Sequence, residues 1–120
     1  MAQSFRQDGI TIIEMDEAYN ALDEEPIEAL SSLLLSEADK SPGPPLLLLD
    51  FSKTVYMGSR VLEVLFRTWK RLKERQGRMV LCGVQPFCGE VLQITHLDRI
   101  WDLLPDRQSG LETLKAKPTS

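Results

Sequence analysis

The sequence is poor in the residues from which metal centres and disulfide frameworks are built. Its 120 residues include one histidine, His96, and two cysteines, Cys82 and Cys88, which are separated by five residues. A zinc site takes about four such ligands, and no CxxC spacing is present, so we expect no metal site and no cofactor. The two thiols are better explained as buried or half-buried side chains of a protein in a reducing compartment.

Long apolar segments are also missing. The longest aliphatic run covers residues 46–49, whereas a membrane-spanning helix needs roughly 20 apolar residues. Residues 1–9 contain Arg6 and Asp8 and lack the apolar core of a signal peptide. We therefore expect a cytoplasmic protein that does not insert into membranes.

Catalytic motifs are absent as well. There is no Ser-His-Asp order, no glycine-rich phosphate loop and no HExxH segment, and Gly83 and Gly89 do not form a GxGxxG pattern. A single histidine near a helix end is far more often structural than catalytic. We therefore expect no enzymatic activity and no catalytic residue.

Charge is unevenly distributed along the chain. The net charge is −4, but residues 1–50 hold 11 acidic and 2 basic residues, whereas residues 60–78 hold 7 basic and 2 acidic ones. Such asymmetry predicts charged surfaces that could select a partner. The isoelectric point of 5.0 argues against nucleic-acid binding. We interpret the basic segment as a solvated helix face and, as the second choice, as a docking face for an acidic protein surface.

Apolar periodicity and turn residues predict strands that alternate with helices. We expect strands over 4–7, 10–15, 46–51, 79–84 and 100–104. We expect helices over 24–38, 59–76, 86–94 and 109–114, with Asp23, Ser59 and Ser109 as N-caps and Gly77 as the C′ residue that ends the second helix. This alternation indicates a mostly parallel sheet with right-handed crossovers, with Leu48, Phe66, Trp69 and Leu81 in the core.

The start of the second helix is the segment that most resembles a site. Ser59 follows a buried strand and a short connector, where the helix dipole and the free amides of the first turn favour an anion. Phosphorylation of Ser59 would add about −1.5 to −2 charges at this helix end, and Arg60 could donate a charge-assisted hydrogen bond to the phosphate. The alternative is that Ser59 only caps the helix.

Four segments in sequence order resemble the motifs of STAS domains of the anti-sigma factor antagonist type. Residues 47–62, LLLDFSKTVYMGSRVL, resemble the family's strand, Asp-Leu-Ser and Asp-Ser-Ser-Gly signature. Residues 77–84, GRMVLCGV, and 91–101, VLQITHLDRIW, resemble its next strand and the helix that follows it. Residues 20–23, NALD, stand where the family has Gly-x-Leu-Asp.

The resemblance implies an α/β fold and a single STAS-like domain over residues 1–120. Within it we expect residues 1–3 and 115–120 to be frayed, as chain ends commonly are. The resemblance further implies a mixed, mostly parallel sheet of about five strands, with about four helices largely on one side. It implies a bacterial protein-interaction switch in transcription regulation, whose partner is an anti-sigma factor or a kinase-like regulator.

The family's phosphorylated serine corresponds to Ser59, so the resemblance implies a partner-binding surface at Gly58, Ser59, Arg60 and Glu63. The neighbours depart from the family motif: Gly58 replaces Asp, Arg60 replaces Ser and Val61 replaces Gly. His96 replaces a further family glycine at a helix end. A non-phosphorylated scaffold or accessory subunit of a transporter or lipid-trafficking complex is the alternative function.

Overall fold

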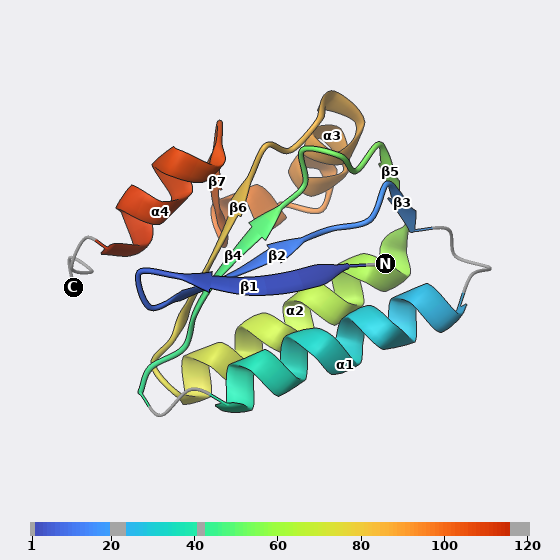
Figure 1. The fold of residues 1–120 in the computed structure, drawn as a ribbon. Coiled ribbons are helices and arrows are strands. Elements are labelled where there is room, and N and C mark those ends of the chain that lie inside the picture. Colours follow the sequence, from blue (N-terminus) through green and yellow to red (C-terminus); the bar gives the residue numbers. More distant parts are fainter. Residues whose placement is uncertain (1, 20–23, 41–42, 116–120) are drawn as a thin grey trace.

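The computed structural model describes residues 2–19, 24–40 and 43–115, which alternate between strands and helices (Figure 1). The strands are β1 (Gln3–Gln7), β2 (Ile10–Glu14), β3 (Ala18–Tyr19), β4 (Leu46–Asp50), β5 (Tyr56–Met57), β6 (Arg78–Cys82) and β7 (Asp102–Leu104). The helices are α1 (Glu24–Lys40), α2 (Ser59–Glu74), α3 (Pro86–Ile94) and α4 (Arg107–Lys115), with a 3-10 turn, η1 (Leu97–Arg99), after α3.

The main sheet has five strands in the order β1-β2-β4-β6-β7. β1 and β2 form an antiparallel hairpin, and the other neighbours run parallel. β3 and β5 form a separate two-stranded parallel ladder. Within the described residues, four α-helices accompany this sheet, so the predicted mixed, mostly parallel STAS architecture is confirmed.

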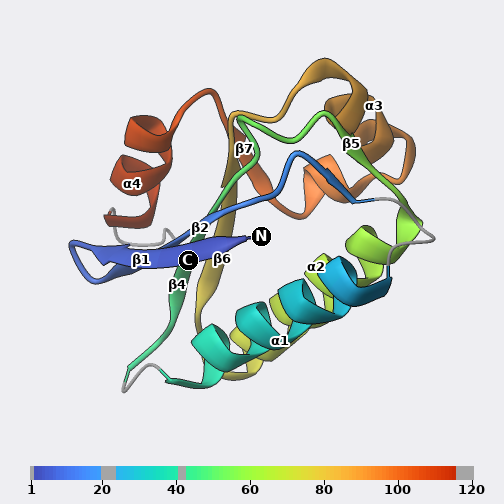
Figure 2. The same cartoon turned by 45° about the vertical axis from the view of Figure 1, so that its right-hand side comes forward.

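Helices cover both faces of the sheet. α1 and α2 lie side by side against one face, and α4 lies against the other (Figures 1 and 2). Alternate residues of the central strands divide accordingly. Leu47, Leu49 and Leu81 pack with α1, α2 and α3, whereas Leu48 and Val80 pack with α4. The expectation that the helices lie largely on one side therefore holds for three of them, and α4 is the exception.

Two of the four residues predicted for the core are not fully buried. Leu48 and Leu81 are fully buried, as predicted. Phe66 is 38% exposed, so its assignment to the core is wrong, and Trp69 is only partly buried. The buried stripe of α2 runs through Val61, Leu65 and Leu72, and Phe66 lies beside this stripe because consecutive helical residues are about 100° apart.

Two predicted N-caps differ from the structure. The N-cap of α2 is Gly58 rather than Ser59. α4 begins at Arg107 because the Asp106 carboxylate accepts a 2.8 Å hydrogen bond from the backbone N–H of Ser109. A capping aspartate three residues upstream therefore takes the role that was assigned to Ser109. The predicted cap at Asp23 lies outside the described residues.

The end of α2 is a Schellman motif. Gly77 N–H donates to Leu72 O at 2.7 Å and Gln76 N–H donates to Lys73 O at 3.1 Å. The left-handed C′ residue is Gln76, with φ 59°, so the assignment of Gly77 to C′ is wrong by one position. His96 also has a left-handed backbone, with φ 62°, which a histidine tolerates better than most residues.

Gly77 is needed for close approach rather than for a left-handed turn. A Cβ atom at this position would lie 2.3 Å from the Pro45 carbonyl oxygen. We expect Gly77→Ala to lower the free energy of unfolding by about 1–3 kcal/mol, because backbone must move to relieve the overlap. Urea denaturation measures the loss. The control is Gly89→Ala in α3, where the nearest atom would be 3.8 Å away; equal effects of the two changes would contradict this explanation.

Both cysteines are free and buried, on opposite faces of the sheet. Burial raises the pKa of the Cys82 thiol to about 12 and also raises the pKa of Cys88. The prediction that both thiols are buried or half-buried is confirmed, and a raised pKa makes a thiol less reactive. In the described residues, no helix combines the length and apolar character required to cross a bilayer.

Two residues that were predicted to fray belong to regular structure. Gln3 pairs with Glu14 in the β1–β2 hairpin, and Lys115, the last residue of α4, forms a 2.8 Å ion pair with Asp8. The remaining residues predicted to fray, except Ala2, lie outside the described part of the chain.

Candidate functional site

The connector between β4 and α2 is fixed by hydrogen bonds to its neighbours. Ser52 N–H donates to Asp50 Oδ1 at 2.9 Å, and Gln85 Nε2 donates to Ser52 O at 2.7 Å. The buried Thr54 hydroxyl donates to Asp16 O at 2.6 Å. These bonds anchor the connector to the segments after β2 and β6, so the start of α2 is held at the carboxyl edge of the sheet.

Ser59 is the first residue of α2 and is exposed. Gly58 caps the helix with an extended backbone and supplies no side-chain hydrogen bond, and no acidic residue occupies the first turn. The first-turn amides of a helix lack intrahelical acceptors, and the helix dipole makes this end electropositive. The end of α2 is therefore not neutralised by a carboxylate of its own first turn.

Arg60 points away from Ser59 towards α1. Its Nη1 atom forms a 3.0 Å ion pair with Glu24 Oε1 at the start of that helix. Both side chains are substantially exposed, so this pair contributes little to stability. The predicted hydrogen bond from Arg60 to a phosphate would require Arg60 to leave Glu24.

Ser59 also lies at one end of a groove between α2 and the α3–η1 segment, which we call the α2–α3 groove. Its volume is about 520 Å³, and it is lined by Ser59, Leu62, Glu63, Phe66, Arg67, Lys70, Thr95 and Leu97. Of the four predicted partner-binding residues, Ser59 and Glu63 line this groove, whereas Gly58 and Arg60 do not.

The other residues of the groove were not predicted to form a surface site. Phe66 had been placed in the core, and Arg67 and Lys70 had been assigned to a solvated face. Their spacing carried a usable signal, since Ser59, Glu63, Phe66 and Lys70 follow an i, i+4, i+7, i+11 pattern along one helix face. Thr95 and Leu97 carried no such signal, because they reach the groove through the turn after α3.

Two exposed aromatic side chains lie near the connector. Tyr56 in β5 is 38% exposed and Phe87 in α3 is 46% exposed. Their rings stack with centroids 5.4 Å apart and an interplanar angle of 22°, a geometry that stabilises an aromatic pair. The stack links β5, which directly precedes Gly58 and Ser59, to α3.

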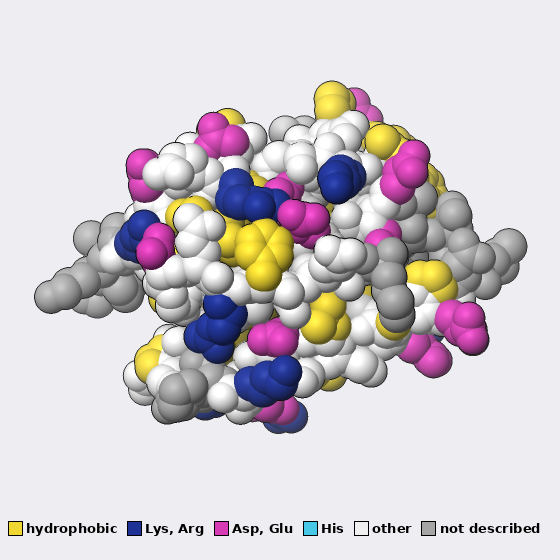
Figure 3. All heavy atoms as spheres, in the orientation of Figure 1, with side chains coloured by type: hydrophobic (Ala, Val, Ile, Leu, Met, Phe, Trp, Pro, Cys, Tyr) yellow, Lys and Arg dark blue, Asp and Glu magenta, His cyan; other side chains and the backbone are white. Residues whose placement is uncertain are grey.

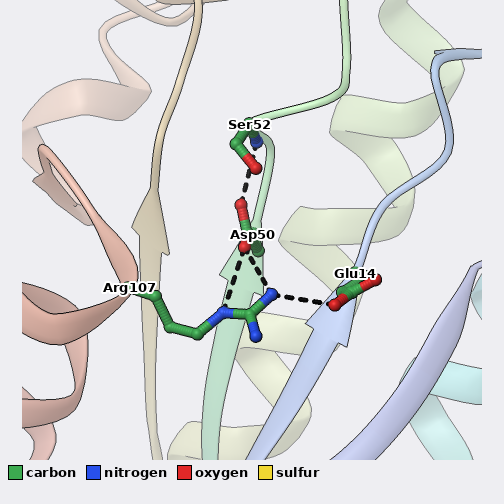
Figure 4. A network of polar contacts seen from close by, with 4 residues as sticks. All are labelled: Glu14, Asp50, Ser52 and Arg107. Atoms are coloured by element: carbon green, nitrogen blue, oxygen red, sulfur yellow. Dashed lines mark hydrogen bonds and ion pairs between the residues drawn. The ribbon is translucent and has the colours of Figure 1, made fainter.

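A charged network lies behind the connector (Figure 4). Arg107 of α4 donates to Asp50 Oδ2 from Nε at 3.1 Å and from Nη2 at 2.7 Å, and Nη2 also contacts Glu14 Oε1 at 3.0 Å. Burial alone would raise the pKa of Asp50, but hydrogen bonds from Ser52 and the Arg107 guanidinium outweigh it, and the pKa lies below its usual value. Asp50 is therefore an ionised, nearly buried anchor for the connector.

Elsewhere the surface charge is mixed. On the face that carries β1, basic and acidic side chains lie next to one another (Figure 3). Ion pairs such as Lys115–Asp8 and Arg78–Asp102 belong to this pattern of local compensation. Among the described residues, no cluster of His, Cys, Asp and Glu side chains is suited to hold a metal ion.

Comparison with known proteins places these features in a family. The model of the STAS domain matches residues 3–110. BtrV of Bordetella bronchiseptica, assigned by name to the anti-sigma factor antagonists, is 29% identical over 108 residues, which cover 90% of this chain and 89% of BtrV. STAS anti-sigma factor antagonists are non-catalytic.

Solved structures agree with this assignment. An anti-sigma-factor antagonist (STAS) domain protein from Planctomyces limnophilus is 32% identical with a TM-score of 0.82, covering 94% of this chain and 96% of that one. The phosphorylated form of the Bacillus cell fate determinant SpoIIAA has a TM-score of 0.74 at 14% identity, covering 94% and 98% of the two chains. The latter identity supports a shared fold only.

Proposed function

Since this chain belongs to the STAS domain family, we propose that it is a cytoplasmic protein-interaction switch that binds an anti-sigma factor or kinase-like regulator at the Ser59 end of α2. Phosphorylation of Ser59 weakens that binding. The observation that carries the proposal is that Ser59 is exposed at an uncompensated helix N-terminus and also lines the α2–α3 groove. A single modification there alters both the charge and the shape of an accessible surface.

The local structure favours a phosphate that leaves the fold intact. Ser59 occupies the first turn, where free amides and the helix dipole stabilise an anion. The helix is capped by Gly58, without a side-chain hydrogen bond, so a phosphate on Ser59 does not remove a cap. The hydrogen bonds that hold the connector involve Ser52 and Thr54 rather than Ser59. The effect of the phosphate is therefore confined to the surface that the partner contacts.

The relatives support the same kind of role. BtrV is named for antagonism of anti-sigma factors, and SpoIIAA has been solved in a phosphorylated form. Both similarities extend over nearly the whole chain. They favour a protein partner over a small-molecule substrate for this chain.

The test requires the natural partner, identified by co-purification from the host, and calorimetry with purified proteins. We expect Ser59→Asp to weaken binding at least about tenfold, or about 1.4 kcal/mol, while Ser59→Ala stays near wild type. Ser32→Asp, at an exposed position on α1, is the matched control and should bind like wild type. Mass spectrometry of the native protein should find phosphate on Ser59.

The residues around Ser59 differ from the family motif, and this supports an alternative function: a docking scaffold without a phosphoswitch. It is favoured by Arg60, whose ion pair with Glu24 ties it to α1 rather than to the serine. This alternative holds if Arg60→Glu weakens binding while both Ser59 variants bind normally. If all three variants bind like wild type and remain folded, the partner docks elsewhere and the proposed surface is wrong.

A further inference from the structure

The α2–α3 groove is lined by apolar side chains, by two cations and, near Ser59, by the carboxylate of Glu63. Leu62, Phe66 and Leu97 supply the apolar surface, and Arg67 and Lys70 supply the charge. Phe66 is 38% exposed, and the Lys70 ammonium lies 6.0 Å from the centre of its ring. An exposed aromatic ring next to cations is typical of a surface that recognises a protein segment.

Several cations of the described surface are neutralised by ion pairs, whereas Arg67 and Lys70 are not. Arg60, Arg71, Arg78 and Arg107 each form an ion pair with a carboxylate. Within the described part of the chain, neither Arg67 nor Lys70 has a carboxylate within ion-pair distance. Their charge is thus available to a ligand.

The two cations also border a second hollow. This hollow, of about 310 Å³ between α1 and α2, is lined by Leu35, Arg67, Lys70, Arg71 and Glu74. Arg67 and Lys70 therefore stand on the ridge between two depressions. A segment lying across the ridge could place carboxylates on both cations and an apolar side chain against Phe66.

We propose that this surface binds an acidic, amphipathic segment of the partner, with aliphatic side chains in the α2–α3 groove and carboxylates on Arg67 and Lys70. The proposal rests on the proposed function and adds the charge and character of the partner. From Ser59 to Lys70 the helix rises about 16 Å, which matches about three turns of a bound helix. The isoelectric point of 5.0 lies below the basic range of nucleic-acid-binding domains, which argues for a protein partner.

Distance separates the two ends of this surface. Ser59 and Arg67 are about 12 Å apart along the helix axis, whereas the screening length at physiological salt is about 8 Å. A phosphate on Ser59 therefore acts mainly on the part of the segment that lies beside Ser59 and Glu63. Arg67 and Lys70 set the affinity, and Ser59 modulates it.

The experiment is an NMR titration of the isotope-labelled protein with a synthetic amphipathic peptide of about 14 residues, built from leucine at helical spacing and glutamate elsewhere. The same peptide with lysine in place of glutamate and an oligothymidylate are compared. We expect only the glutamate peptide to shift the amide signals of residues 66–70, Thr95 and Leu97. Its affinity should fall as NaCl is raised from about 50 to about 300 mM.

Charge reversal supplies the decisive comparison. The double variant Arg67→Glu, Lys70→Glu should bind the glutamate peptide at least about tenfold more weakly, while its melting temperature stays near wild type because both side chains are exposed. The control is Lys73→Glu on the same helix. The Lys73 ammonium lies over the Trp69 ring, 4.7 Å from its centre, and Lys73 lines neither hollow. The control variant should bind nearly like wild type.

The proposal is overturned if the glutamate peptide leaves these signals unmoved, if the lysine peptide binds equally well, or if Lys73→Glu has the same effect as the double variant. Tighter binding of the oligothymidylate at the same residues would assign the surface to nucleic acid instead. The titration uses no natural partner and leaves Ser59 unchanged. If the glutamate peptide binds as expected but the Ser59 variants bind the natural partner like wild type, only the phosphoswitch is refuted. If the peptide does not bind but Ser59→Asp weakens partner binding, only the acidic segment is refuted.

Discussion

Replacing Leu48 with Asp is expected to abolish soluble expression. Leu48 is fully buried in the central strand β4 and packs against α4. The change removes the buried leucine, at a cost of about 3–5 kcal/mol, and adds a buried carboxylate without a partner, at a cost of several kcal/mol more. The sum reaches the total stability of a typical domain, about 5–15 kcal/mol.

The measurement is the fraction of the variant in the soluble lysate, followed by circular dichroism of any recovered protein. The control is Ile94→Asp, because the Ile94 side chain is 77% exposed at the end of α3 and the same change there should be nearly neutral. A soluble, cooperatively folding Leu48→Asp protein would show that β4 does not lie between two packed layers.

The second large effect is expected for Arg107→Met, which leaves the Asp50 carboxylate without its guanidinium. Removing one partner of a fully buried ion pair costs about 3–5 kcal/mol. Arg107 is 34% exposed, so solvent screens part of the interaction and we expect a loss of about 2–3 kcal/mol at neutral pH. Urea denaturation measures this loss of stability. The control is Arg71→Met, which removes an exposed ion pair with Asp39 and should lower the free energy of unfolding by less than about 1 kcal/mol.

The pH dependence of this loss identifies its origin. The pKa of Asp50 is lower in the folded protein than its usual value of 3.8. Its contribution is therefore present above that value and is lost as the pH falls through the lower folded pKa. The stability difference between wild type and Arg107→Met should narrow as the solution is acidified below about pH 4. A difference that stays constant would instead indicate lost packing of Arg107 over the Phe5 ring, 5.1 Å away.

The elements of the fold could be predicted because their signals are local. The run over residues 46–51 is too short for a helix and too apolar for an exposed strand, and all of it except Phe51 forms the central strand β4. Pro86 opens α3 as its position suggested. The two-residue strands β3 and β5 escaped prediction because such short segments carry no periodicity. Helix caps shifted by one to three residues because neighbouring residues can also cap, as Gly58 and Asp106 do.

The candidate site was predictable only in part, for the same physical reason. Ser59 and Glu63 belong to one helix, so spacing placed them together. The Arg107–Asp50 and Arg107–Glu14 contacts join residues 57 and 93 positions apart, and nothing in the local sequence indicates such pairs. Phe66 was misplaced because an aromatic residue next to an apolar stripe looks like part of it. The exposure of Phe66 can be recognised only once it is known which face of α2 packs against α1 and the sheet.

The two buried thiols provide an internal reporter of which layer opens. Cys82 is shielded by α4, together with Leu111 and Leu114, whereas Cys88 belongs to the opposite cluster with α1, α2 and α3. An alkylating reagent reaches a buried thiol only during an excursion that exposes it. Faster alkylation of Cys82 therefore reports detachment of α4, whereas faster alkylation of Cys88 reports loosening of the layer beneath the Ser59 surface. The comparison uses the unmodified sequence and needs no engineered label.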